Sequence, residues 1–104
     1  MERNFVFRGQ ECCYDYYWLD DTFYFCFNLL NDKDFVDEDG DEYFIRCQYC
    51  KDNEDNDLCS PWYFERWYEH DCVDACDYFN DKLTEDEVKN IKEFMLVLMY
   101  YALN

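Results

Sequence analysis

The stretch that decides the fold is residues 22–27, which read TFYFCF. In an extended chain successive side chains point to opposite sides, so Phe23, Phe25 and Phe27 would share one face. Aromatic residues are enriched in strands, which favours a strand here, with a helix as the alternative. Residues 4–45 share this aromatic composition, so we expect further strands in the N-terminal half of the chain.

Two helices are expected to follow the strands. Ser60 and Pro61 are the residue types that cap and begin a helix, which predicts a helix over residues 62–80. Thr84 and Glu87 have the spacing of a capping box and predict the start of a second one. In this last helix the apolar residues recur at steps of three and four, which indicates either a core helix or a helix that partly docks a partner. These residues are Val88, Ile91, Met95, Leu98 and Ala102.

Two acidic runs separate the expected elements. Residues 37–42 contain Asp39-Gly40 between apolar stretches, and the positive φ that glycine allows predicts a hairpin turn. Residues 51–58 are too polar for a core and are expected to form a loop. The sequence thus predicts one small α+β domain over residues 1–104, with N-terminal strands and a hairpin, two C-terminal helices and a zinc site that staples them.

The charge balance excludes several kinds of partner. The 104 residues hold 26 Asp and Glu against 9 Lys and Arg, a formal net charge of -17, which opposes contact with a nucleic-acid backbone or an anionic membrane. A basic protein is the better expected partner. Half of the residues are hydrophobic, far more than in a disordered acidic tail. Residues 1–11 carry only a short apolar stretch bracketed by charges, so we expect no export signal and a cytoplasmic protein. The alternative is a protein whose leader is missing.

Eight cysteines suggest a metal site. In a reducing compartment clustered thiols more often bind a metal than form disulfides. Cys47 and Cys50 are separated by two residues, a spacing at which a tight turn directs both sulfurs at one tetrahedral zinc ion. A redox role for this pair is less expected, because the acidic loop that follows would raise the thiol pKa values.

A second pair of ligands is expected from Cys72 and Cys76. Their spacing of four places both thiols on one face of a helix, one turn apart. The alternative is that the cysteines are reduced and several are plain core residues. The predicted structural zinc site is Cys47, Cys50, Cys72 and Cys76, with Cys59 and His70 as substitutes.

Motifs for catalysis are missing from the sequence. The single histidine is followed by Asp71-Cys72, which does not match the His-x-Glu of zinc nucleobase deaminases. Counting back from Gly40 puts Phe35 first in the loop, which breaks the acidic pattern of an EF-hand. We therefore expect a binding protein and not an enzyme.

The acidic runs are interleaved with aromatic residues. Such runs are usually a solvated face that keeps a protein soluble. The alternative is that the carboxylates compete for an Arg- and Lys-rich channel that otherwise holds nucleic acid, while aromatic side chains anchor the interface. The residues expected to make this contact are Asp52, Glu54, Asp55, Asp57, Trp67 and Tyr68.

In size, acidity and Phe/Tyr/Asn/Lys/Asp-rich composition, the whole chain resembles the small acidic anti-CRISPR proteins of phages. The resemblance implies a binding inhibitor of a type II RNA-guided DNA nuclease in the cytoplasm of a bacterial host. Such an inhibitor docks on a basic nucleic-acid-binding or mobile lobe and prevents target DNA loading. The class has no common motif, so the resemblance assigns no residue.

Two other functions fit the same residues. The first is a zinc-stabilised adaptor for a basic transcription or chromatin protein, and the second is a redox or metal-handling protein. Low Gly and Pro content, abundant aromatic residues and the lack of a basic tail favour the inhibitor over both.

Overall fold

The predicted strand around Phe25 is β4, Thr22–Asn28. The structure is a computed structural model that describes residues 3–29, 32–33, 36, 44–68, 71–74 and 83–102, with the backbone alone described for 66–68 and 71–74. Burial alternates along β4, and Phe23, Phe25 and Phe27 are fully buried while the residues between them are not. This confirms the strand and its shared aromatic face.

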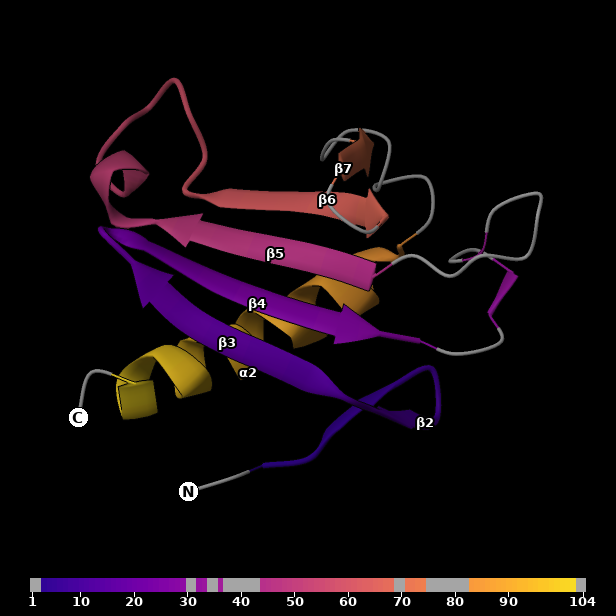
Figure 1. Ribbon diagram of the computed structural model, residues 1–104. Helices are drawn as coiled ribbons and strands as arrows, with labels where there is room; N and C mark the ends of the chain where they lie inside the picture. The colour runs from indigo at the N-terminus through magenta and orange to yellow at the C-terminus, as the bar shows by residue number, and fades with distance from the viewer. Residues whose placement is uncertain are drawn as a thin grey trace.

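Five strands form one antiparallel sheet in the order β3-β4-β5-β6-β7 (Figure 1). The bounds are β3, Tyr14–Leu19; β5, Phe44–Cys50; β6, Trp62–Tyr68; and β7, Asp71–Asp74. Each strand pairs with its neighbour in sequence, so the sheet is a meander. Asp20 and Asp21 connect β3 to β4, and Asp20 adopts a positive φ of 54°, which aspartate tolerates better than most residues.

A separate hairpin precedes the sheet. It consists of β1, Phe5–Phe7, and β2, Gln10–Cys12, joined by Arg8 and Gly9. Both joining residues have positive φ, 54° and 75°, as a type I′ hairpin turn requires. Arg8 then reaches the start of the C-terminal helix, where its Nε lies 2.8 Å from Oε2 of Glu87.

The C-terminal helix is α2, Glu85–Ala102, and its predicted capping box is confirmed. The backbone N–H of Glu87 donates to Oγ1 of Thr84 at 3.1 Å, and the N–H of Thr84 donates to Oε1 of Glu87 at 2.9 Å. Burial alone would raise the pKa of Glu87, but hydrogen bonds from Arg8 and Thr84 lower it overall. No helix in the described ranges combines the length and the apolar character needed to cross a bilayer.

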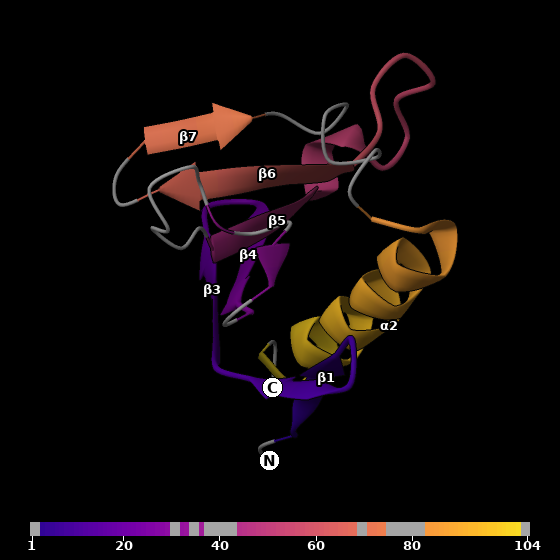
Figure 2. The ribbon, with the colours of Figure 1, turned by 90° about the vertical axis from the view of Figure 1, so that its right-hand side faces the viewer.

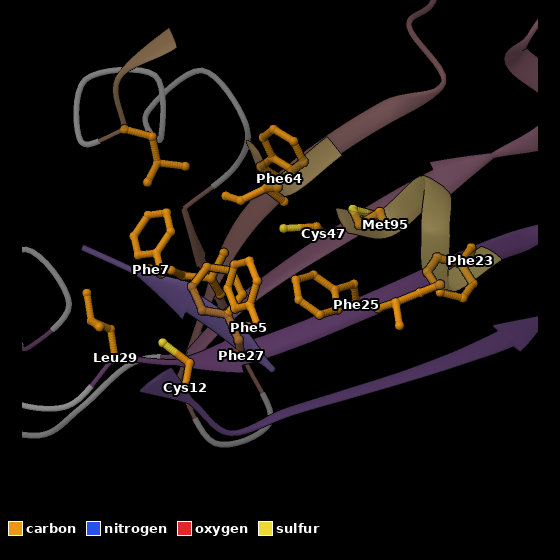
Figure 3. Close-up of a cluster of buried hydrophobic side chains, with 14 of the residues drawn as sticks. Phe5, Phe7, Cys12, Phe23, Phe25, Phe27, Leu29, Cys47, Phe64 and Met95 are labelled. Atoms are coloured by element: carbon orange, nitrogen blue, oxygen red, sulfur yellow. The ribbon is translucent and has the colours of Figure 1, made fainter. Parts of the chain in front are cut away.

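The core lies between the sheet and α2, which covers one face of it (Figure 2). Phe5 joins three elements, because its ring centroid lies 5.1 Å from that of Phe25, 4.8 Å from that of Phe27 and 4.8 Å from that of Phe94. Figure 3 shows these rings from the hairpin and the sheet gathered in one cluster. The buried positions of α2 are Ile91, Met95, Leu98 and Met99, so most of the predicted apolar stripe faces this core.

The helix predicted over residues 62–80 is wrong where the structure describes it, because residues 62–68 and 71–74 are strands β6 and β7. Oγ of Ser60 does accept a hydrogen bond from the N–H of Trp62, at 3.1 Å, but the bond closes a local turn before a strand. The aromatic sequence that follows pairs with β5 instead of coiling.

The fold class is α+β, with antiparallel strands followed by one C-terminal helix in the described part of the chain, where two were expected. The hairpin predicted at residues 37–42 lies outside the described residues.

Replacing Phe25 by Ala is expected to lower the free energy of unfolding by about 3–5 kcal/mol, because it leaves a cavity where the hairpin, the sheet and α2 meet. Chemical denaturation measures this loss. The control is Val6→Ala on the exposed side of β1, expected to change stability by no more than about 0.5 kcal/mol. Equal effects of the two substitutions would contradict the assignment of the core.

Candidate docking surface

An ordered acidic loop joins β5 to β6. It begins with a 3-10 turn, Lys51–Asn53, and the hydroxyl of Tyr49 donates to Oε1 of Glu54 at 2.6 Å. Burial, and next the hydrogen bond to Glu54, raise the pKa of Tyr49 to about 12, so this phenol stays a donor at neutral pH. Further on, the N–H of Leu58 donates to Oδ1 of Asn56 at 2.8 Å. The loop predicted from the sequence therefore has a defined shape.

The loop lies beside the turn between β3 and β4. The N–H of Lys51 donates to the carbonyl oxygen of Asp21 at 3.0 Å, and Figure 1 shows the turn and the loop at the same end of the sheet. We call this region the acidic end. Apart from Asp21, which is half-buried, its acidic side chains are all exposed. It comprises Asp20, Asp21, Asp52, Glu54, Asp55 and Asp57.

Two carboxyl groups of the acidic end interact directly. A side-chain hydrogen bond with Asp52 lowers the pKa of Asp21, and the same bond raises the pKa of Asp52. The repulsion between the two charges adds to the rise at Asp52. The pair thus holds one proton more tightly than two isolated carboxyl groups would.

The sheet face opposite α2, here called the outer face, carries an aromatic pair. The rings of Tyr17 and Tyr24 stack with centroids 5.0 Å apart and an interplanar angle of 19°. The guanidinium carbon of Arg46 lies 4.3 Å from the centroid of Tyr24. Tyr17 is 45% exposed, so this pair offers aromatic surface beside the acidic end.

A buried carboxylate holds the outer face together. Glu65 is 5% exposed, and its Oε1 accepts a hydrogen bond from Nε2 of Gln48 at 2.7 Å and lies 3.6 Å from Nε of Arg46. Cys26 of β4 pairs with Arg46 of β5. Burial raises the pKa of the Cys26 thiol to about 11, although the positive charge of Arg46 opposes the shift. This thiol is protonated at neutral pH and is not an activated nucleophile.

The structure does not bring the predicted zinc ligands Cys47 and Cys50 together. They stand three residues apart on β5, and Cys50 is itself extended, with φ −101° and ψ 113°. Side chains alternate along a strand, so the two thiols point to opposite faces. Cys47 is fully buried on the side of Met95 (Figure 3), whereas Cys50 is half-buried. The tight turn expected between them is a continuous strand.

Cys72 is also placed differently from the prediction, because it lies in strand β7 and not in a helix. It pairs with Trp67 of β6, which pairs with Phe44 at the far end of β5 from Cys50. Six residues at about 3.3 Å each put Cys50 and Cys72 about 20 Å apart along the sheet, too far to share an ion with sulfur about 2.3 Å from zinc.

Of the remaining predicted zinc ligands, one lies in the described part of the chain and two do not. Cys59 is exposed in the acidic loop and lines one hollow with Cys50, whereas His70 and Cys76 lie outside the described residues. Within the ranges that the structure describes, no three His, Cys, Asp or Glu side chains gather into a group that could hold a metal ion. Zinc binding stays a prediction from the sequence.

The predicted partner-binding residues lie at two ends of the sheet. Asp52, Glu54, Asp55 and Asp57 share the acidic loop, as expected. Trp67 and Tyr68 end β6, whose start adjoins that loop, so their backbone lies about 17 Å away along the strand.

The sequence analysis missed Asp20, Asp21 and the stacked Tyr17 and Tyr24. The sequence feature that could have revealed them is the pair Asp20-Asp21 between two aromatic runs. A two-residue hairpin turn at this pair places Tyr17 opposite Tyr24. Comparisons with known proteins found no matching family model, curated protein or solved structure.

Cys47→Ser and Cys50→Ser are expected to behave differently. Cys47→Ser puts a hydroxyl into the apolar core and should cost about 1–3 kcal/mol of stability. Cys50→Ser, at the half-buried strand end, should change stability by no more than about 0.5 kcal/mol. Thermal unfolding and elemental analysis of both variants are the measurements. Equal destabilisation with loss of bound zinc from both would show that the two thiols share an ion.

Asp52→Asn is expected to raise the unfolding midpoint at pH 7, because the amide can donate to Asp21 without a second negative charge. Because the pKa of Asp52 is raised in the folded state, ionising this carboxyl destabilises the fold when the pH is above that pKa. Below the unfolded-state pKa of about 4, Asp52 is protonated in both states and this destabilisation is absent. Variant and wild type should therefore converge as the pH falls towards 4. Thermal unfolding across pH tests this, with Asp55→Asn as the control. A gain that persists at low pH would refute the shared proton.

Proposed function

We propose that this protein is a binding inhibitor whose acidic end docks on the basic nucleic-acid-binding surface of another protein and keeps nucleic acid off it. The observation that supports this most directly is the acidic end itself. Two segments far apart in sequence, the β3–β4 turn and the loop after β5, present their carboxylates together at one end of a rigid sheet.

Preorganisation makes these carboxylates suitable for binding. The hydrogen bonds of Tyr49, Leu58 and Lys51 fix the loop before any partner arrives. A fixed loop loses little conformational entropy on binding, so more of the interaction energy remains as affinity. Duplex DNA presents one negative charge per roughly 1.7 Å of its axis, and closely spaced carboxylates can compete for the same Arg and Lys side chains.

Apolar side chains stand beside the charges. Leu58 is 93% exposed in the acidic loop, and Leu19 is 56% exposed just before the β3–β4 turn. Tyr17 on the adjoining outer face adds a flat aromatic surface. Charges mainly accelerate encounter, whereas desolvated apolar and aromatic anchors slow dissociation. Trp67 and Tyr68 are proposed as further anchors at the distant end of β6.

The proposed partner is a type II RNA-guided DNA nuclease in the cytoplasm of a bacterial host, as the resemblance to phage anti-CRISPR proteins suggests. Such nucleases hold nucleic acid in a positively charged channel and recognise it largely through its backbone. A net charge of -17 draws the inhibitor to that channel and opposes binding to the nucleic acid.

The test is the kinetics of binding to a guide-loaded type II nuclease at several ionic strengths. The wild-type association rate should fall steeply with salt. Asp52→Asn, Asp55→Asn and Asp57→Asn combined should slow association by about tenfold at low salt, with a flatter salt dependence and a nearly unchanged dissociation rate.

A second triple variant provides the control, because Glu85→Gln, Asp86→Asn and Glu93→Gln remove the same charge from exposed positions on α2. This control should associate nearly as fast as wild type. Equal slowing by both triples would contradict docking through the acidic end. Binding to a nuclease already filled with target DNA, as tight as to the empty one, would contradict the proposed inhibition.

A further inference from the structure

Strand β3 is one edge of the sheet, and its backbone geometry can be assigned. Its two-residue connection to β4 makes Leu19 and Thr22 a hydrogen-bonded pair. At the other end the N–H of Asn28 donates to the carbonyl of Cys13 at 3.3 Å. Hydrogen-bonded pairs alternate along an antiparallel ladder, so residues 13, 15, 17 and 19 bond to β4. The backbone groups of residues 14, 16 and 18 point away from the sheet.

These outward groups have no backbone partner in the described part of the chain. Open edges are usually protected by proline, lysine, a bulge or a short length. The other edge, β7, has two of these features, since it is four residues long and its pairing with β6 shifts register between Arg66 and Trp67. β3 spans six residues, YDYYWL, without proline or lysine. It is therefore the edge that can accept another strand.

A hollow of about 420 Å³ lies along the first part of this edge. It is lined by Arg3, Asn4 and residues 12–16, and the hydroxyl of Tyr14 closes one side by donating to the carbonyl of Arg3. An extended segment laid along β3 would have this hollow at one end and the acidic end at the other.

We propose that β3 binds an extended basic segment of the partner protein as a sixth strand of the sheet. This inference rests on the proposed function and specifies which partner element is bound. Asp15 on the outer face and Asp20 beyond the strand favour Lys or Arg in the added strand. Tyr16 and Trp18, on the other face, favour apolar or β-branched residues between the basic ones. A second copy of this chain is disfavoured, because both copies carry a net charge of -17.

The probe is a twelve-residue peptide of alternating Lys and Val, tested by fluorescence anisotropy. Two variants at one position separate backbone from side chain. Tyr16→Ala removes the ring but keeps the outward N–H, whereas Tyr16→Pro also removes that N–H, which lies outside the β3–β4 ladder. We expect Tyr16→Pro to bind the peptide at least tenfold more weakly than Tyr16→Ala.

Amide hydrogen exchange on the wild-type protein gives an answer that does not depend on how well the proline variant folds. The Lys-Val peptide should protect the amides of Tyr16 and Trp18, and the matching Glu-Val peptide should not. No binding, equal binding by the two variants, or protection elsewhere would overturn the added strand, as would self-association of the free protein through β3.

Failure of the added strand can be told apart from failure of the proposed function. Peptide binding at β3 with no effect of DNA on nuclease binding would refute only the inhibitor. Salt-dependent nuclease binding that Tyr16→Pro leaves unchanged, relative to Tyr16→Ala, would refute only the added strand.

Discussion

The packing of Phe5 against Phe25, Phe27 and Phe94 is the interaction on which the rest of the structure depends. It joins the N-terminal hairpin, the sheet and α2 in one place. Aromatic side chains bury about 150–250 Å² each, so a small chain obtains much of its core from a few of them. Because β4 alternates strictly, placing these rings inside turns Tyr24 and Cys26 to the outer face.

The surface features follow from that register. The pairing that buries Phe23 opposite Trp18 sets Tyr17 on Tyr24 and brings Asp20 and Asp21 to the end of the sheet. The pairing of β4 with β5 then places the acidic loop beside this turn. One face of the sheet packs against α2 and forms the core. The β3 edge and the acidic end are the parts that we propose for contact with a partner.

Local patterns predicted the elements that local chemistry decides. The alternation of residues 22–27 and the capping box of Thr84 and Glu87 are confirmed, because both depend on neighbours in sequence. The helix predicted from Ser60-Pro61 is wrong, because the Ser60 hydrogen bond that caps a helix can also close a turn before a strand. Pairing with β5 made the residues that follow a strand. The spacing of Cys47 and Cys50 carried no information on whether a turn or a strand lies between them. The acidic end needed the long-range pairing of two segments, which no local pattern contains.

The most direct test of the account is the amide-exchange footprint of the protein on a guide-loaded type II nuclease. The account predicts protection of residues 15–21 and 51–60, which form the edge strand, the turn and the acidic loop, while the amides of α2 change little. Protection confined to α2, around exposed Leu96 and Tyr100, would contradict it and place the docking surface on the opposite side of the sheet.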